Sequence, residues 1–232
     1  MNIEEIKAKI ALIASQGYRD GSSVTKGFTY HNIPFDEFAG PAHKDISKEF
    51  IEILSNYGDP ANKSVLEIGC ANGYYTFNLA KLGASEIVAY EADTLVWDVN
   101  ESIRVLKEIE NIKFINKKFN EVDIAEHALQ DKVFDLCLML NVHMWIVKQV
   151  GFERSIYLMD ALSRICKTMY FQTSHKESAG MFVVRELGTV DDVKDYLEVC
   201  NFDPVLIRVN RSHDGKPRAL FRCASKSAGV GV

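Results

Sequence analysis

The chain has 232 residues, of which 47% are hydrophobic, and its formal net charge at pH 7 is −5. This length and composition suffice for one sizeable core and give no sign of two separate domains. The acidic balance excludes a protein that coats nucleic acid through a generally basic surface, but it leaves room for a local basic patch.

The cysteines and the N-terminus indicate the cellular compartment. The five cysteines are odd in number and contain no C-x-x-C pair, so neither a disulfide framework nor a zinc site is predicted. The start, "MNIEEIKAKI", has acidic residues where a signal peptide needs a basic start and an apolar run. No apolar stretch approaches the ~20 residues that span a bilayer. The sequence therefore predicts a soluble, cytoplasmic protein.

The first part of the chain combines two helical patterns with an irregular segment. Apolar residues recur at helical spacing over residues 2–15 and again over residues 44–57. The segment between them, "GFTYHNIPFDEFAG", is too irregular for either a helix or a strand. We interpret residues 1–60 as a helical cap or lid that precedes the main domain.

From Ser64 onward, apolar strands alternate with helical patterns. The expected strands are 64–69, 86–90, 112–116, 133–140, 167–173, 204–209 and 218–224, and the expected helices are 73–82, 94–109, 151–165 and 190–200. Thr189, with Asp192 three residues later, predicts a capping box for the last helix.

This order of elements predicts the fold class. Strands that alternate with helices form a mostly parallel sheet covered on both faces, whereas two strands joined without a helix are antiparallel. The last two strands are joined only by "NRSHDGKP". We therefore predict an α/β fold with a Rossmann-like, doubly wound sheet of seven strands, mostly parallel with an antiparallel last strand. This domain spans residues 61–225 and is followed by a tail, 226–232.

The first strand of the domain runs into the turn "VLEIGCANGYY", which is a candidate ligand site. A dinucleotide fingerprint starting at Gly69 needs glycine at two later positions, where Ala71 and Tyr74 stand, and a Walker loop needs a lysine that is missing. The turn instead places an acid, Glu67, two residues before its first glycine. A carboxylate there suits a ligand with a positive group and repels a pyrophosphate.

A second acid narrows the choice of ligand. Glu91 ends the strand in "IVAYEA", eighteen residues after Gly73, where a carboxylate can accept both hydroxyls of a ribose. A ligand with a ribose, an amino-acid ammonium and no phosphate is S-adenosylmethionine (SAM). Ligands of such sheets bind beyond the carboxyl ends of the strands, so we expect the turn, Glu91, Phe119 and the segment after Leu140 along one edge.

These residues resemble the class I SAM-dependent methyltransferases, whose first motif is an acidic-x-Gly-x-Gly-x-Gly turn. The chain departs from that motif at Ala71, a substitution small enough to keep the turn. Within the superfamily, "VLEIGCANGYYTFNLAKLGAS", "FDLCLMLNVHMWIV" and "KPRALF" are most similar to bacterial methyltransferases that modify or cap cell-surface polysaccharides, including O-antigen chain terminators. The upstream "YHNIPF" and "GPAHKDISKEFIEIL" are similar to these enzymes too, and more distantly to enzymes that modify the wobble uridine of tRNA.

The resemblance implies SAM as the cofactor and assigns residues to it. The implied cofactor-binding residues are Tyr30, Lys48, Glu67, Gly69, Cys70, Ala71, Gly73, Glu91, Ala92, Phe119, Asn120 and Asn141. In this family the turn places backbone against the methionine part, the acid before it orders the turn, and the second acid holds the ribose. No metal is implied, since the chain shows neither a histidine-rich cluster nor a suitable spacing of acids.

The resemblance also implies the remaining cofactor roles. Phe119 and Asn120 match the place where such enzymes sandwich and hydrogen-bond adenine, although Phe119 could simply be core. By the same resemblance, Asn141 is expected to contact the methionine moiety and to face the transferring methyl group. Tyr30 and Lys48 are expected to close over the cofactor and to contact its carboxylate.

The catalytic group depends on the acceptor. Methyl transfer is an in-line substitution, so an enzyme aligns the nucleophile within ~3–3.5 Å and removes a proton only if the acceptor is a hydroxyl. The family often carries a histidine after the fourth strand, but here His143 stands one position away from the usual place. His143 and His175, which follows the fifth strand, are the candidate bases, and either could instead be a hydrogen-bonded structural residue.

The basic residues near the end of the chain indicate the kind of methyl acceptor. Residues 208–222 hold five basic residues against one acid, although the whole chain is acidic. Arginine in the turn between the last two strands suits a phosphate or carboxylate, and the alternative is a solvated hairpin. Aromatic rings could add flat surfaces for a sugar or a base. The candidate substrate-binding residues are His31, Trp145, Arg211, Lys216 and Arg218.

The sequence thus predicts a SAM-dependent methyltransferase that O-methylates a sugar or an anionic group in cell-surface polysaccharide or sugar metabolism. The expected partner is a small-molecule or glycan acceptor, without insertion into a membrane. Two alternatives stay open: a tRNA-modifying methyltransferase with a local basic patch, and a non-catalytic cofactor-binding subunit that serves a partner enzyme.

Overall fold

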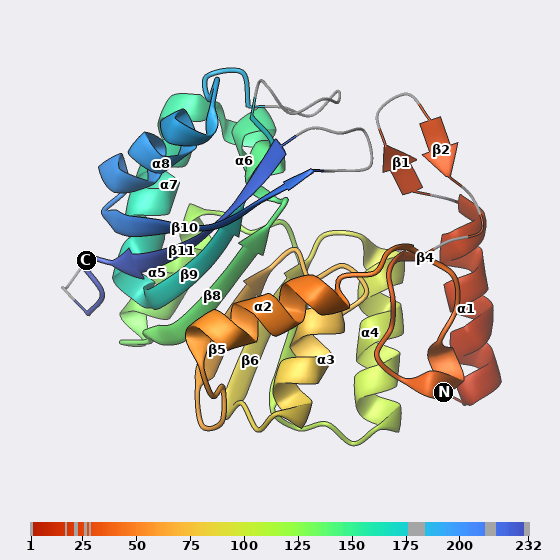
Figure 1. Cartoon of the computed structure of the whole chain (residues 1–232). Coiled ribbons are helices and arrows are strands. Elements are labelled where there is room, and N and C mark those ends of the chain that lie inside the picture. The colour runs from red at the N-terminus through yellow and green to blue at the C-terminus, as the bar shows by residue number, and fades with distance from the viewer. Residues whose placement is uncertain are drawn as a thin grey trace. The chain divides into compact units, whose positions relative to one another are not determined.

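The computed structural model describes residues 2–16, 18–20, 23–25, 27, 29–175, 184–211 and 217–229. The chain divides into two compact units, Met1–Lys118 and Phe119–Val232. Figure 1 colours the first unit from red to yellow-green and the second from green to blue. The predicted boundary at residue 60 lies inside the first unit, and the division into cap, domain and tail stays a prediction.

The first unit carries a parallel three-stranded arrangement in which β6 lies between β5 and β7. Successive residues of β5 are buried, as expected for a strand covered on both faces. Its main elements are α1 (Ile3–Gln16), α2 (Ser47–Tyr57), β5 (Ser64–Ile68), α3 (Tyr74–Lys81), β6 (Glu86–Glu91), α4 (Thr94–Leu106) and β7 (Ile112–Asn116). All of these agree with the predicted elements, with boundaries shifted by a few residues.

The segment predicted to be irregular contains short regular pieces. β3 pairs with β4 in parallel, and β1 pairs with β2 antiparallel. These pieces are β1 (Tyr18–Asp20), β2 (Ser23–Thr25), β3 (Thr29–His31), the 3₁₀ helix η1 (Asp36–Phe38) and β4 (Ala42–Lys44). Each has three residues, which is too short for a hydrophobic period to appear in the sequence.

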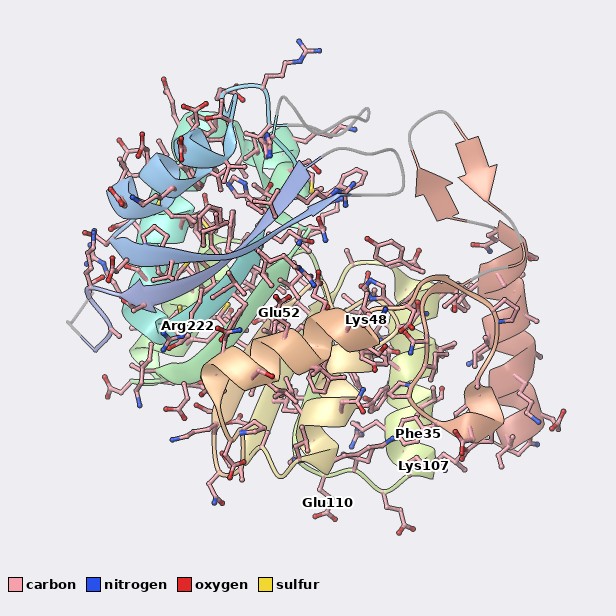
Figure 2. The ribbon with its side chains drawn as sticks, viewed as in Figure 1. Phe35, Lys48, Glu52, Lys107, Glu110 and Arg222 are labelled. Atoms are coloured by element: carbon pink, nitrogen blue, oxygen red, sulfur yellow. The ribbon has the colours of Figure 1, made fainter. Side chains whose placement is uncertain are left out.

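Ion pairs and ring contacts tie the N-terminal segment to the helices that follow. Lys9 of α1 pairs with Asp98 of α4, and Lys107, directly after α4, pairs with Glu37 of η1. The Lys107 ammonium also lies 5.3 Å from the ring centroid of Phe35; both residues are labelled in Figure 2. These contacts join α1, η1 and Phe35 to α4 and the residue that follows it within the first unit.

In the second unit the strand order is β10-β11-β9-β8. β8 and β9 are parallel, and β11 runs antiparallel to both of its neighbours, which confirms the predicted reversed last strand. The unit contains α5 (Glu121–Leu129), β8 (Phe134–Leu140), α6 (His143–Val150), α7 (Phe152–Ile165), β9 (Cys166–Gln172), α8 (Val190–Val199), β10 (Phe202–Arg211) and β11 (Pro217–Ser225). The predicted capping box of Thr189 and Asp192 is present at α8.

Two helices of this unit were not predicted. The apolar run "FDLCLMLNVHMWIV" continues from β8 into α6, so hydrophobicity does not separate the strand from the helix. α5 begins with a capping box formed by Asn120 and Asp123, a local signal that the sequence did offer.

The seven longer strands, three in the first unit and four in the second, give the predicted Rossmann-like α/β class. Within the described part of the chain, no helix combines the length and apolar character needed to cross a membrane.

Candidate active site

The glycine-rich turn between β5 and α3 uses left-handed backbone at alternate residues. Gly69, Ala71 and Gly73 have φ values of 76°, 47° and 70°. A Cβ atom on Gly73 would lie 2.8 Å from the ring of Phe77, so a side chain here would have to displace that buried ring and would strain the backbone. Ala71 keeps the turn as predicted, but an alanine in this conformation costs roughly 1–2 kcal/mol.

Glu91, the last residue of β6, is bonded to that turn. Its Oε2 accepts the backbone N–H of Ala71 at 2.9 Å, and its Oε1 accepts that of Asp93 at 2.8 Å. Burial raises the pKa of Glu91, with the nearby carboxylate of Asp93 adding to the effect. Each carboxylate oxygen can accept more than one hydrogen bond, so both stay available to ligand hydroxyls. The structure therefore brings the two predicted features together.

Glu67 lies in β5, two residues before the first glycine of the turn. Its side chain is buried, and it accepts a hydrogen bond from the hydroxyl of Thr76 in α3. Burial raises the pKa of Glu67 to about 8, partly offset by that bond. The bond joins the end of β5 to the start of α3, and the role of Glu67 in ordering the turn stays a prediction.

Two asparagines at the turn were not among the predicted site residues. The Oδ1 atom of Asn72 accepts the backbone N–H of His31 at 3.0 Å, and the amide of Asn100 donates to the carbonyl of Ala71 at 2.6 Å. Among the described residues, the buried Nδ2 of Asn72 and Oδ1 of Asn100 have no hydrogen-bond partner. An unmet buried polar group costs about 1–3 kcal/mol, so such groups indicate a missing partner.

The residues at the turn fit SAM. The Nδ2 of Asn72 is a donor, which matches the carboxylate of an amino-acid moiety. The Oδ1 of Asn100 is an acceptor, which matches its ammonium. Glu91 supplies acceptors for ribose hydroxyls, and Gly69 has no side chain to keep a ligand away from the backbone of the turn. The sequence signal for Asn72 was its place inside the motif, while Asn100, in the middle of α4, gave none.

Tyr30 and His31, in β3, reach the same turn. Besides the bond from the His31 backbone to Asn72, the His31 ring stacks on Tyr30 with centroids 4.2 Å apart. The His31 ring also meets Tyr75 of α3 edge to face. The structure thus brings these two predicted residues beside the cofactor turn, and their binding roles stay predictions.

Lys48 and Ala92 are exposed, the first on α2 and the second directly after β6. Figure 2 labels Lys48 on its helix. Their predicted contacts with the cofactor stay predictions.

In the second unit, the two residues predicted to contact adenine lie just before α5. Phe119 is buried. Asn120 caps the helix: its Oδ1 accepts the N–H of Val122 at 2.8 Å, and its own N–H donates to Asp123 at 2.9 Å. Asn120 therefore has a structural role of its own, and contact of either residue with adenine stays a prediction.

Asn141 follows β8 in left-handed conformation, with φ of 60°. Its Nδ2 donates to Oε1 of Gln172 at 2.6 Å, and its Oδ1 accepts from Nη1 of Arg218 at 3.1 Å. A predicted cofactor residue and a predicted substrate residue thus meet through side chains. Gln172 was not predicted, although a polar residue that ends a buried strand is the signal that identified Glu91.

His143 is a buried member of a side-chain network. Its Nε2 lies 2.7 Å from the hydroxyl of Tyr196, and its Nδ1 lies 3.3 Å from that of Thr173. The Tyr196 hydroxyl also lies 3.1 Å from Ser155. Burial lowers the pKa of His143 to about 3, so the ring is neutral at physiological pH. This environment supports the structural interpretation of His143, and its catalytic role stays a prediction.

The other candidates differ in how much the structure says of them. His175 is buried and forms an isolated bridge with Val184. Trp145, in α6, is 45% exposed, with the Lys148 ammonium 5.5 Å from its ring centroid. Lys216 and the side chain of Arg211 lie outside the described residues.

A model of a family described as a methyltransferase domain matches residues 59–195. The O-antigen chain terminator bifunctional methyltransferase/kinase WbdD of Escherichia coli is 25% identical over 195 residues, which cover 80% of this chain and 26% of WbdD. The chain therefore spans about a quarter of the length of the curated relatives that it matches.

Solved structures share the fold. A structure of WbdD has a TM-score of 0.70 at 22% identity, covering 86% of this chain and 44% of that one. The N-terminal domain of EvdMO1 with SAH bound has a TM-score of 0.66 at 14% identity, covering 97% of this chain and 98% of that one. The same EvdMO1 domain was also crystallised in the presence of SAH and D-fucose.

Proposed function

Because this chain belongs to the methyltransferase-domain family, we propose that it transfers the methyl group of SAM to an oxygen of a sugar or of an anionic group carried by a sugar. The methyltransferase family and SAM as its cofactor are the basis of this proposal, and the acceptor is its new part. The observation that carries the proposal is the bond between the Glu91 carboxylate and the Ala71 N–H, which holds the second acid against the glycine-rich turn.

Different residues of the first unit bind different parts of the cofactor. Glu91 accepts the ribose hydroxyls, Asn72 donates to the carboxylate, and the bare backbone of the turn lies against the methionine chain. When bound, SAM supplies a methyl group on a sulfonium that an acceptor oxygen attacks in line. The bond from His31 to Asn72 links β3 to the turn, so the N-terminal segment helps to position the same asparagine.

A sugar acceptor is supported by the relatives and by charge. WbdD is named as an O-antigen chain terminator, and EvdMO1 was crystallised in the presence of a sugar. Arg218 of β11 lies next to Asn141, and β10, which pairs with β11, ends at the predicted Arg211. Because the chain matches only part of WbdD, the acceptor of the whole relative does not carry over directly.

The buried histidine bears on proton transfer. A general base works best when its pKa lies near the operating pH, and that of His143 is lowered to about 3. We infer that His143 positions α6 through Tyr196 and does not remove a proton from the acceptor. An acceptor oxygen that is already ionised needs no base.

A binding and transfer experiment tests the proposal. SAM and SAH should raise the melting temperature while NAD and ATP do not, because ligands of the native state stabilise it. Labelled SAM is then incubated with separate pools of nucleotide sugars, polysaccharide fragments and tRNA. Label in a sugar pool supports the proposal, and label in tRNA alone supports the tRNA-modifying alternative. Binding without transfer to any pool favours a non-catalytic subunit, and stabilisation by NAD alone overturns the cofactor.

A further inference from the structure

Two unmet hydrogen-bond donors lie beside Asn141 in the second unit. Gln172 is 3% exposed, and its Oε1 is occupied by the amide of Asn141. Its Nε2 is buried and has no hydrogen-bond partner in the described part of the chain. The same holds for Nε of Arg218, although another nitrogen of that guanidinium donates to Asn141. Both side chains thus have buried N–H groups left over.

The strand register places these donors together. Leu140 and Gln172, at the carboxyl ends of β8 and β9, are directly paired. Leu220 of β11 pairs with Gln172 on the other side. Arg218 lies two residues before Leu220, so it stands on the same face of β11. Asn141, directly after Leu140, completes the group at this end of the strands.

Asn141 fixes the orientation of both neighbours. Its Oδ1 accepts from Arg218, so its Nδ2 must be the atom that donates to Gln172. That bond in turn assigns the Gln172 amide, because the accepting atom is the oxygen and the remaining atom is the –NH₂ group. The unmet groups of the cluster are therefore N–H donors, and one of them belongs to a permanent cation.

A donor set of this composition selects the ligand by its chemistry. A planar guanidinium matches the two oxygens of a carboxylate or phosphate, and an amide N–H adds a third bond. A ligand that itself offers hydrogens, such as an ammonium, would leave these donors unmet. Burying the donors without an acceptor costs free energy, which an oxyanion relieves.

We propose that Gln172 and Arg218, held by Asn141, form a binding site for an oxyanion of the methyl acceptor, either a phosphate monoester or a carboxylate on a sugar. The inference rests on the proposed function and names its substrate class. It also agrees with the buried position of His143, since an ionised acceptor oxygen needs no proton acceptor.

Calorimetry of the SAH-saturated protein with glucose 6-phosphate, glucuronate and glucose tests the site. We expect the phosphate or the carboxylate to bind and glucose to bind at least tenfold more weakly. The preferred anion identifies the source of the oxyanion. Arg218→Gln should weaken binding of the anion at least tenfold, and Arg218→Lys should not restore it, because a lysine lacks the planar fork.

Gln172→Glu replaces the free N–H group with a second acceptor of similar shape and should abolish anion binding. Arg222→Gln is the matched control: Arg222, which is labelled in Figure 2, pairs with Tyr170. It stands four residues after Arg218 on the same face of β11, which corresponds to roughly 13 Å along the strand. Its effect on anion affinity should stay within twofold. Thermal melting of each variant with SAH shows whether the fold and the cofactor site persist.

The outcomes separate the two proposals. If wild-type protein binds SAH but neither anion, or if Arg218→Gln and Gln172→Glu both bind the anion as wild type does, the oxyanion site is wrong and the methyltransferase proposal stands. If SAH itself fails to bind, the proposed function is wrong.

Discussion

The backbone N–H of Ala71 donates to Oε2 of Glu91 at 2.9 Å, so the acid at the end of β6 is part of the glycine-rich turn at the end of β5. The neighbouring strands run parallel, which brings their carboxyl ends to the same edge. Glu91 can therefore hold a ligand and the turn at once, and a change at this residue affects both.

Glu91→Ala should weaken binding of SAH by ~1.5–3 kcal/mol, because hydrogen bonds to a charged group are lost together with the bond that orders Ala71. Isothermal titration calorimetry measures the loss. Glu86→Ala, an exposed acid at the start of the same strand, is the control and should bind as wild type does. If the two variants bound SAH with equal affinity, Glu91 would not be the residue that binds the ribose.

Ala71→Gly should raise the free energy of unfolding by up to about 1 kcal/mol, because glycine tolerates the left-handed backbone but loses more entropy on folding. Urea denaturation measures the change. Ala125→Gly, in the exposed interior of α5, should instead destabilise the protein by about 1 kcal/mol. A destabilised Ala71→Gly variant would contradict the φ of 47° at this position.

Glu67 should make stability depend on pH. Burial raises its folded pKa from 4.5 to about 8, so between these values the folded state binds more protons than the unfolded state. Its contribution to stability is therefore greatest below pH 4.5 and is lost as pH rises toward 8. Glu67→Gln removes the titration and keeps an acceptor for Thr76.

The difference in stability between Glu67→Gln and wild type should consequently move in favour of the variant from pH 5 to pH 8. Chemical denaturation at several pH values measures this difference. A constant difference across that range would show that Glu67 does not titrate there.

His143 should give folding stability the opposite dependence on pH. Its folded pKa is lowered from 6.5 to about 3, so the unfolded state binds more protons between these values. The stability it contributes is present above pH 6.5 and is lost as pH falls toward 3. His143→Gln should be less sensitive to acid than wild type in denaturation experiments. If instead the variant loses an ascending limb of the rate profile near neutral pH, His143 is a base after all.

Patterns within a few residues were enough for much of this protein. The alternation of strands and helices, the acidic glycine turn, the acid at the end of β6 and the capping box at Thr189 depend on local spacing, and each is present in the structure. Local spacing did not predict α6, which follows directly after β8, because a single apolar run forms both the buried strand and the largely buried helix.

The sequence by itself thus determined the fold class, the family and the acids that surround the cofactor turn. Only the tertiary structure decided which distant side chains meet: His31 reaches Asn72 across 41 residues, and Arg218 reaches Asn141 across 77. It also decided that His143 is buried against Tyr196 rather than open to an acceptor. Such contacts depend on strand order and register, which bring together residues whose separation along the chain leaves no periodic signal.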